Sequence, residues 1–308
     1  MARKVLVATE KPFAKAAVDG IKKIFQEAGY ETVMLEKYTD PSDLVKAVAD
    51  VDGLIIRSDK ATKDVIAAGK NLKIIVRAGA GYDNIDCAAA TDKGVVAMNT
   101  PGQNSNAVAE LAAGMMVFMA RGMFKGTSGS ELRGKKLGIH AYGYVGKAVA
   151  AIAKGFGMDI YAFDPFVSAD VFQKDGIKAV ASVEELYSTC HYISLHIPAN
   201  DKTKKSIHFD LMSKMPKGGT IVNTARKEII SEECLKHMFA DREDFKYISD
   251  VAPDCHAELA EKYADRYYST PKKQGAETSE ANINAGLAAA RQIVNFLEKG
   301  DKTFQVNK

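Results

Sequence analysis

The sequence predicts an α/β protein built from two Rossmann-like domains, each with a doubly wound parallel sheet. Short apolar runs alternate with amphipathic stretches along most of the 308 residues, and such alternation favours parallel strands joined by right-handed helical crossovers. A glycine-rich turn between a strand and a helix occurs only after residue 135, so a complete α/β unit precedes the unit that begins there. The chain is long enough for both units to bury a core of their own.

The elements of the first unit follow from their apolar runs. In chain order these runs predict a strand at 3–8, a helix at 12–28, strands at 31–36, 51–56 and 73–76, and a helix near 62–69. Continuous apolar runs are typical of parallel strands, which are buried on both faces.

The glycine-rich turn is the most informative motif of the chain. A short apolar strand in the stretch that begins at Lys135 leads into Ala141-Tyr142-Gly143-Tyr144-Val145-Gly146, a helix begins at about Val145, and the next strand, 159–163, leads to Asp164. Backbone N–H groups of such a turn approach a pyrophosphate, while the acid binds ribose hydroxyls and repels a 2′-phosphate. We therefore expect NAD rather than NADP, bound by Gly143, Tyr144, Val145, Gly146 and Asp164. Ala141 replaces the first glycine of G-x-G-x-x-G, and alanine adopts a positive φ only at a cost.

Three later strands end in polar residues. They are predicted at 192–196, 220–223 and 247–250, and they lead into His196-Ile197-Pro198, Asn223-Thr224-Ala225-Arg226 and Asp250. Ligands of open parallel sheets bind beyond the carboxyl ends of the strands, so we expect nicotinamide and substrate here, although ordinary surface turns would also be polar. An alanine-rich helix at 285–299 and a short polar tail follow.

Composition argues against several classes of function. The net charge of +3, from 42 basic and 39 acidic residues, is too even for a protein that binds nucleic acid or a membrane surface. The N-terminal residues show no signal-peptide core, and the longest apolar stretch, 111–120, is too short to cross a bilayer. The cysteines are widely separated and the histidines lack metal-binding spacing. We therefore expect a cytoplasmic protein with reduced thiols, no metal and a small-molecule substrate.

Several further segments occur in a recognisable order between about residues 54 and 286. They are Arg57-Ser58, Arg77-Ala78-Gly79-Ala80-Gly81-Tyr82-Asp83-Asn84-Ile85-Asp86, Met98-Asn99-Thr100-Pro101-Gly102-Gln103-Asn104-Ser105, Ala109-Glu110, the glycine-rich turn, Asn223-Thr224-Ala225-Arg226 and Asp250-Val251. With these segments the chain resembles the D-2-hydroxyacid dehydrogenases, and within that family the phosphoglycerate dehydrogenase branch. The resemblance implies a substrate-binding domain, 1–99 plus 285–308, a NAD-binding domain, 100–284, and a site in the cleft between them. Within the phosphoglycerate dehydrogenase branch, the chain resembles a short form that lacks the C-terminal serine-sensing domains.

The resemblance also implies an activity and a set of site residues. The enzyme would oxidise 3-phospho-D-glycerate to 3-phosphohydroxypyruvate by hydride transfer to NAD, the first step of phosphorylated serine biosynthesis. Arg226 would hold carboxylate and carbonyl oxygen together, as a planar guanidinium can. The implied substrate-binding residues are Arg57, Ser58 and Arg77 for the phosphate, Gly79, Ala80 and Gly81 for the carboxylate, and Asn104. The implied cofactor-binding residues beyond the turn are Ala80, His196, Ile197, Pro198, Thr224, Ala225 and Asp250, the last as acceptor for the nicotinamide carboxamide.

Two positions depart from the family pattern. The family's general base is a histidine in T-P-H-x-G-A, whereas this chain has Thr270-Pro271-Lys272-Lys273-Gln274-Gly275-Ala276. Anchoring on Gly275-Ala276 makes Lys273 the base and anchoring on Thr270-Pro271 makes it Lys272; we prefer Lys273, because an insertion is better absorbed before the Gly-Ala turn. A lysine, with an ordinary pKa of about 10.4, needs burial or a neighbouring cation to act as a base.

The second departure is at the family's partner glutamate, whose position falls on Cys255. The partner acid is therefore missing unless Asp254 or Glu258 replaces it. His256 is a minor alternative base.

Other interpretations stay open at this point. A glyoxylate or hydroxypyruvate reductase is favoured if Arg57 and Arg77 do not face the substrate. A non-catalytic, NAD-sensing protein similar to the corepressors of this fold is a third interpretation, because fold does not fix function. In the family the helix at 104–121 builds a homodimer interface, but packing in the core would explain its apolar run equally well.

Overall fold

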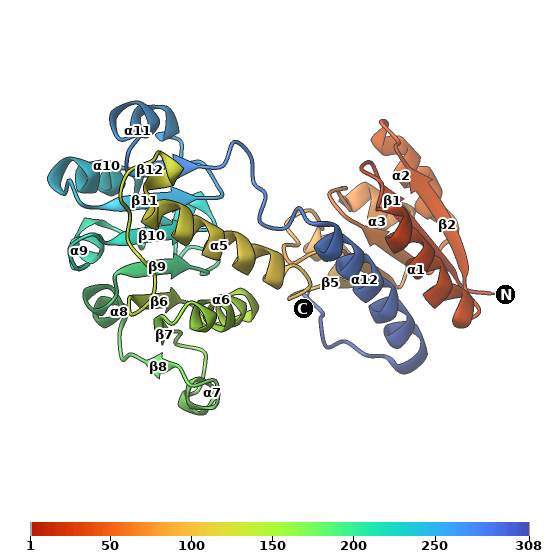
Figure 1. Cartoon of the computed structure of the whole chain (residues 1–308). Coiled ribbons are helices and arrows are strands. Elements are labelled where there is room, and N and C mark those ends of the chain that lie inside the picture. The colour runs from red at the N-terminus through yellow and green to blue at the C-terminus, as the bar shows by residue number, and fades with distance from the viewer. Residues whose placement is uncertain (1, 308) are drawn as a thin grey trace. The chain divides into compact units, whose positions relative to one another are not determined.

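The structure is a computed structural model that describes residues 2–307. The chain forms two compact units (Figure 1). Unit 1 comprises the residues up to Asn104 together with those from Glu277 onward, and unit 2 comprises Ser105–Ala276. Each unit is an α/β domain with an entirely parallel sheet, which confirms the predicted fold class.

Unit 1 contains a sheet in the order β2-β1-β3-β4-β5. The order reverses between β1 and β3, and α/β proteins commonly bind ligands beyond the carboxyl ends of the strands at such a reversal. The elements are β1 (Lys4–Thr9), α1 (Lys15–Glu27), β2 (Glu31–Glu36), α2 (Pro41–Ala47), a 3-10 turn (Val48–Asp50), β3 (Gly53–Ile56), α3 (Lys63–Ala68), β4 (Ile74–Arg77), α4 (Cys87–Asp92), β5 (Val96–Asn99) and α12 (Ser279–Lys299).

Strands β1, β3, β4 and β5 are buried on both faces, as their continuous apolar runs require, whereas the edge strand β2 is only half-buried or exposed. In β1, Val5 and Val7 pack into the core that α1 and α12 cover, whereas Leu6 and Ala8 pack into the core under α2, α3 and α4. This alternation follows from the two-residue period of a strand. The C-terminal helix α12 is therefore an integral part of unit 1 and lies beside α1 (Figure 1).

Helix α12 begins earlier than predicted, at Ser279 rather than at residue 285. The Thr278 side chain caps it by accepting a hydrogen bond from the Ala281 N–H at 3.1 Å, which satisfies one of the unpaired donors of the first turn. The alanine-rich pattern begins only at residue 285 and hides this first turn. The helix ends before Gly300, whose φ of 68° is the left-handed conformation common after a helix.

Unit 2 contains a sheet in the order β12-β11-β10-β9-β6-β7-β8, which reverses between β6 and β9. Its elements are α5 (Ser105–Ala120), a 3-10 turn (Gly122–Phe124), β6 (Lys136–His140), α6 (Tyr144–Gly155), β7 (Asp159–Phe163), α7 (Ala169–Lys174), β8 (Lys178–Ala179), α8 (Val183–Thr189), β9 (Tyr192–Leu195), α9 (Phe209–Met212), β10 (Thr220–Asn223), a 3-10 turn (Lys227–Ile229), α10 (Glu232–Asp241), β11 (Lys246–Ser249), α11 (His256–Lys262) and β12 (Tyr267–Ser269).

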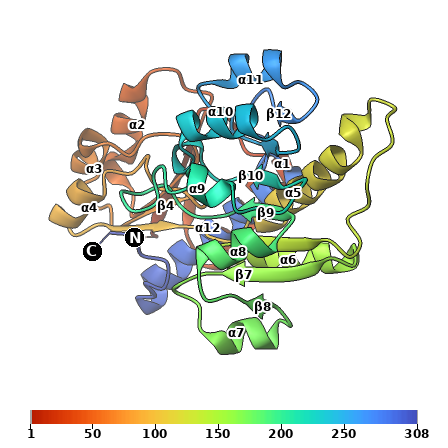
Figure 2. The same ribbon diagram turned by 90° about the vertical axis from the view of Figure 1, so that its left-hand side faces the viewer.

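Two helical layers cover this sheet. Helices α5, α6 and α7 share one core with it, and α8, α9, α10 and α11 share the other. Figure 2 is turned so that α8 and α9 lie in front of the strands. Much of α5 is buried in unit 2's own core, including Ala109, Ala112 and Met116, so core packing explains a large part of its apolar run. No helix within residues 2–307 is long and apolar enough to cross a membrane.

Candidate active site

The glycine-rich turn follows β6 and has a strained residue at its start. Ala141 has a φ of 78°, a left-handed conformation that costs a non-glycine residue about 1–2 kcal/mol. The Asp164 carboxylate stabilises the turn, because its Oδ2 accepts a hydrogen bond from the Tyr142 N–H at 2.8 Å. Its Oδ1 accepts one from the Phe166 N–H at 2.9 Å. Asp164 thus organises the turn in addition to its predicted role toward ribose.

Helix α6 presents an uncapped N-terminus. Gly143 is the N-cap residue, and no side chain caps the helix there; a Cβ at Gly143 would have no heavy atom within 4 Å. A Cβ at Gly146 would instead lie 2.4 Å from the Ala141 carbonyl oxygen, so only glycine lets α6 approach the strand so closely. An uncapped helix N-terminus beside open space suits an anion such as a pyrophosphate. Tyr144 and Val145 form the exposed and half-buried parts of this first turn.

Orphaned polar atoms lie at the next strand ends of unit 2. Within residues 2–307 the buried His196 Nε2 and Thr224 Oγ1 have no hydrogen-bond partner. His196 follows β9, at the point where the strand order reverses, and its N–H bonds the His140 carbonyl oxygen at 3.0 Å. Ile197 is buried and Pro198 is exposed. Buried polar atoms of native proteins are rarely left unsatisfied, so these atoms fit a bound polar ligand such as a dinucleotide.

The two histidines of this edge are uncharged near neutral pH. Burial lowers the pKa of His140 to about 4, against a smaller upward effect of Asp164. Burial, with a smaller contribution from His140, lowers the pKa of His196 to about 3. Neither ring therefore offers a positive charge to a ligand.

Asn223 shapes the turn that carries Arg226. Its buried side chain accepts a hydrogen bond from the Ala225 N–H at 3.0 Å and donates to the Arg226 carbonyl oxygen at 3.0 Å and the Tyr247 hydroxyl at 3.1 Å. The Arg226 side chain is exposed, with Nη1 bonded to the Ala225 carbonyl oxygen at 2.9 Å. Sequence reasoning recognised the motif but did not assign Asn223 this positioning role.

Asp250 binds the loop that carries the two lysines. The carboxylate is fully buried. Its Oδ1 accepts hydrogen bonds from the Thr270 hydroxyl at 2.9 Å and the Gln274 N–H at 2.8 Å, and its Oδ2 accepts one from the Gly275 N–H at 2.7 Å. Both oxygens are thus engaged by the loop. Lys272 and Lys273 lie in the exposed part of this loop.

The position of the family's glutamate has a different arrangement. The Asp254 and Cys255 N–H groups donate to the Glu232 carboxylate at 2.7 and 2.9 Å. Asp254 pairs with Lys227, and Glu258 pairs with Lys262 at 2.8 Å. Burial raises the pKa of the Cys255 thiol to about 12, so it carries no charge at neutral pH. Glu232 was not anticipated from sequence, since it lies on another helix.

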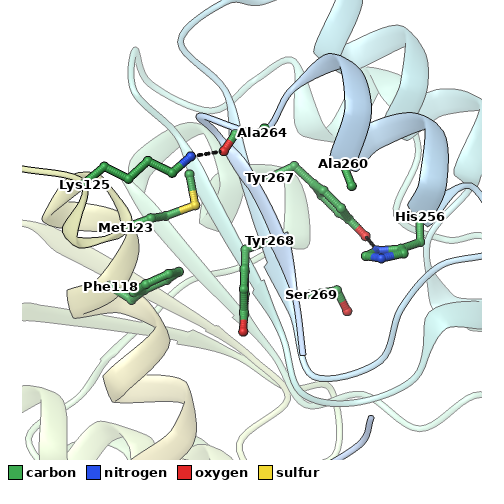
Figure 3. A pocket seen from close by; sticks show the side chains of 9 residues that line it. All are labelled: Phe118, Met123, Lys125, His256, Ala260, Ala264, Tyr267, Tyr268 and Ser269. Atoms are coloured by element: carbon green, nitrogen blue, oxygen red, sulfur yellow. Dashed lines mark hydrogen bonds between the residues drawn. The ribbon is translucent and has the colours of Figure 1, made fainter. Parts of the chain in front are cut away.

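A cavity of about 340 Å³ in unit 2 is lined by the alternative base His256 but by none of the other residues expected at the site (Figure 3). His256 lines it, with Nδ1 at 2.8 Å from the Tyr267 hydroxyl, and Phe118 contributes an aromatic wall with Tyr268. The alternative base His256 is therefore engaged by Tyr267 in a cavity apart from the predicted set.

Unit 1 places the two arginines at adjacent strand ends. Arg57 and Arg77 lie at the carboxyl ends of the adjacent strands β3 and β4, and Arg77 Nε donates to the Arg57 carbonyl oxygen at 3.1 Å. A Cβ at Gly79 would fall 1.8 Å from Arg77 Nη1, so the glycine lets the guanidinium lie against the backbone. Ser58 next to Arg57 is exposed.

The other substrate-binding residues predicted in unit 1 lie in the loop after β4 or directly before α5. The Ala80 carbonyl oxygen accepts a hydrogen bond from the Asn99 side chain at 2.6 Å, which fixes the segment containing Gly81. Ala80 itself is exposed, and Asn104, partly buried, is the last residue before α5. These contacts join the loop after β4 to the end of β5.

Two residues near the start of α12 hold the Arg57 side chain, which is only 17% exposed. Its Nη2 donates to Asn282 Oδ1 at 2.5 Å and lies 3.6 Å from Glu277 Oε2. The guanidinium carbon also lies 5.9 Å from the centre of the Phe13 ring. Neither Glu277 nor Asn282 was anticipated; the acid directly after Gly275-Ala276 is the signal that could have drawn attention to Glu277.

Comparison with known proteins agrees with this geometry. A family model described as D-isomer specific 2-hydroxyacid dehydrogenase, catalytic domain, matches residues 12–307. The D-3-phosphoglycerate dehydrogenase of Methanocaldococcus jannaschii is 35% identical over 294 residues, which cover 89% of this chain and 55% of the relative. The hydroxypyruvate reductase of Thermotoga maritima is 36% identical over 286 residues, which cover 87% of this chain and 92% of the relative.

A solved structure is more similar still. The NAD+-bound 3-phosphoglycerate dehydrogenase of Entamoeba histolytica has a TM-score of 0.87 and 50% sequence identity, and the match covers 100% of this chain and 99% of that one. The chain spans about half the length of the curated phosphoglycerate dehydrogenases that it matches. Because the family model covers almost the whole chain, the protein belongs to the D-isomer specific 2-hydroxyacid dehydrogenase family.

Proposed function

We propose that the protein oxidises 3-phospho-D-glycerate to 3-phosphohydroxypyruvate with NAD as hydride acceptor. The observation that carries this proposal is the pair of arginines, Arg57 and Arg77, at adjacent strand ends of unit 1. Two guanidinium groups suit a phosphate dianion, and a 50%-identical structure is a 3-phosphoglycerate dehydrogenase. Unit 1 would bind substrate and unit 2 would bind NAD.

The cofactor would be held by the edge of unit 2 where the strand order reverses. The pyrophosphate would lie at the N-terminus of α6, and Asp164 would bind the adenosine ribose. His196 and Thr224 have the unsatisfied buried atoms that a polar ligand would engage. NAD supplies the hydride acceptor; binding and orientation fall to these residues of the chain.

The substrate would be held at both of its ends. Arg57, Ser58 and Arg77 would bind the phosphate, and the backbone of Gly79-Ala80-Gly81 would bind the carboxylate, with Asn104 beside it. Arg226 would bind the carboxylate and the oxygen that becomes a carbonyl. Its charge would also stabilise the alkoxide character that develops as the proton leaves.

Lys273 would remove the hydroxyl proton. Asp250 fixes Gly275 through its N–H group, and a Cβ there would lie 3.0 Å from Asp250 Oδ2. Asp250 also accepts hydrogen bonds from the Thr270 hydroxyl and the Gln274 N–H, so both ends of the loop are fixed. The assignment of Lys273 rather than Lys272 rests on the position of Lys273 two residues before Gly275, next to the fixed Gln274. Asp250 would support catalysis by holding the loop that carries Lys273 in place.

One observation favours the reductase alternative. Glu277 partly neutralises Arg57, which weakens a phosphate site, and the Thermotoga maritima relative is a hydroxypyruvate reductase. In that case phosphorylated and unphosphorylated substrates would be used equally well.

We also propose a cytoplasmic homodimer. The four cysteines are free, which fits a reducing compartment. Phe118 of α5 packs edge-on against Phe124 and Tyr268. The Phe124 side chain is 67% exposed. An exposed aromatic group of this kind is typical of an interface.

The test is NADH formation from NAD and 3-phosphoglycerate at raised pH, with D-lactate and D-glycerate as controls. We expect turnover of the phosphorylated acid well above that of both controls. Arg57→Ala should raise KM for 3-phosphoglycerate much more than it weakens NAD binding. Equal turnover of D-glycerate, or an unchanged KM in Arg57→Ala, would support the reductase instead.

A further inference from the structure

The Arg57 guanidinium is held at one corner only. Both of its polar partners, Asn282 Oδ1 at 2.5 Å and Glu277 Oε2 at 3.6 Å, contact the same nitrogen, Nη2. Within residues 2–307, Nε and Nη1 of Arg57 make no hydrogen bond. Both bidentate edges of a guanidinium, Nε with Nη2 and Nη1 with Nη2, include Nη2, so an anion that binds Arg57 bidentately must share the nitrogen that Asn282 and Glu277 contact.

Asn282 and Glu277 act differently on this guanidinium. Asn282 is fixed in turn, because its Nδ2 donates to the Thr278 carbonyl oxygen at 2.9 Å in the first turn of α12. Asn282 and the face of Phe13 both contact the Arg57 guanidinium, so two contacts other than Glu277 position it. Glu277 contributes a longer contact from a side chain that is 60% exposed, so its main effect is a negative charge rather than a fixed geometry.

A substrate phosphate bound to Arg57 would come close to that negative charge. Both anions would share one guanidinium, and the phosphate would carry nearly two charges at neutral pH. The carboxylate of an unphosphorylated acid would bind elsewhere and would not meet Glu277. The repulsion is thus specific to substrates that carry a phosphate.

We propose that Glu277 is a specificity-determining residue that competes with the substrate phosphate for Arg57. It sets how strongly the enzyme prefers phosphorylated over unphosphorylated 2-hydroxyacids and 2-oxoacids. This inference rests on the proposed function, since it assumes that Arg57 binds the phosphate.

The test compares Glu277→Gln with the original protein on two substrates that differ only in the phosphate, 3-phosphohydroxypyruvate and hydroxypyruvate, reduced with NADH. Removing the charge should lower KM for the phosphorylated substrate by about three- to tenfold at low ionic strength, as a nearby screened charge would. KM for hydroxypyruvate and both kcat values should stay within about twofold, and added salt should shrink the difference between the proteins. Glu280→Gln, an exposed acid in the first turn of the same helix, is the control and should change neither KM.

The inference is overturned if Glu277→Gln leaves KM for 3-phosphohydroxypyruvate unchanged, raises it, or lowers both KM values equally. Titration calorimetry with 3-phosphoglycerate in the presence of NADH separates this result from a failure of the proposed function. If Glu277→Gln binds 3-phosphoglycerate more tightly than the unsubstituted protein does, but neither protein turns over a phosphorylated substrate, the proposed function is refuted and the inference about Glu277 stands. Equal affinities in the two proteins would refute the inference alone.

Discussion

Ala141 is strained in the turn where most dinucleotide sites have glycine. Its φ of 78° costs about 1–2 kcal/mol for alanine, whereas glycine adopts it freely but loses about 0.5–1 kcal/mol of chain entropy on folding. Ala141→Gly should therefore raise the free energy of unfolding by about 0.5–1 kcal/mol in urea titration. Ala151→Gly, in the exposed middle of α6, is the matched control and should lower it by about 1 kcal/mol. A loss of stability in both variants would show that the strain at Ala141 is relieved in solution.

Asp164 carries the choice of cofactor. A 2′-phosphate would face this carboxylate, so we predict a preference for NAD over NADP of about tenfold or more, equivalent to about 1.4 kcal/mol. Asp164→Ser should reduce the preference. It should also raise KM for NAD, because the carboxylate holds the Tyr142 N–H. The measurement is kcat/KM for both cofactors; equal use of NADP by the unsubstituted protein would contradict the assignment.

At the scale of elements, the ends of β6 and β9 make stability depend on pH. His140 and His196 have pKa values lowered to about 4 and about 3 by burial. Below about pH 6.5 the same rings gain protons in the unfolded chain but remain neutral in the folded one. Above about pH 6.5 the rings are neutral in both states, so their titration takes nothing from the stability of the folded protein. As pH falls from there toward the folded pKa values, the free energy of unfolding decreases by up to about 1.4 kcal/mol per pH unit for each ring.

The pH dependence can be measured without any ligand. The free energy of unfolding from urea titrations between pH 6.5 and 4.5 should fall with decreasing pH, and the fall should be less steep in His196→Phe. This ring is the suitable one to replace, because its Nε2 has no partner within residues 2–307. An identical slope in the two proteins would mean that His196 is protonated in the folded state as readily as in the unfolded state.

Several elements could be predicted from local sequence because their signal is strong and short-ranged. The strands β2, β7 and β10 have the predicted bounds, since each is a compact apolar run next to turn residues. The helices α7 to α11 were not identified. Most are short, as in α9 with four residues, and a helix of one turn shows no amphipathic period. The strand β8 has two exposed residues, which leaves no apolar pattern to detect.

In the candidate site, too, the residues in local motifs could be predicted from sequence, whereas the long-range contacts could not. The glycine-rich turn, Asp164 and Arg226 stand in local motifs, so sequence alone could propose them. The contact between Arg57 and Asn282 joins residues 225 positions apart, and the bonds from Asp250 to its loop span 24 and 25 positions. No local spacing encodes such contacts, because they depend on how α12 and the strand ends pack.

At the scale of the whole molecule, the chain returns to its first unit after completing its second. Ala285, Ala289 and Ile293 of α12 complete the core over β1, β3 and β4. The same return brings Glu277 and Asn282 to Arg57. The segment just before it, which Asp250 fixes, carries Lys272 and Lys273. The last segment of unit 2 thus carries the proposed base, and the segment by which the chain re-enters unit 1 carries the two residues that contact Arg57, the proposed phosphate-binding arginine.

Lys273, as the proposed base, removes the proton from a phosphorylated 2-hydroxyacid, and the kcat of Lys273→Ala for oxidation of 3-phosphoglycerate by NAD tests this role most directly. Oxidation should become faster as pH rises, because the lysine must lose its proton to act as a base. Loss of this general base should lower kcat by about 10²–10⁴ and should abolish that pH dependence. NADH binding, followed by NADH fluorescence, should be unchanged, and Lys272→Ala should have only a mild effect. A Lys273→Ala protein that turns over at a near-normal rate would contradict the account: inactivity of Lys272→Ala would then make Lys272 the base, and full activity of both variants would place the base elsewhere.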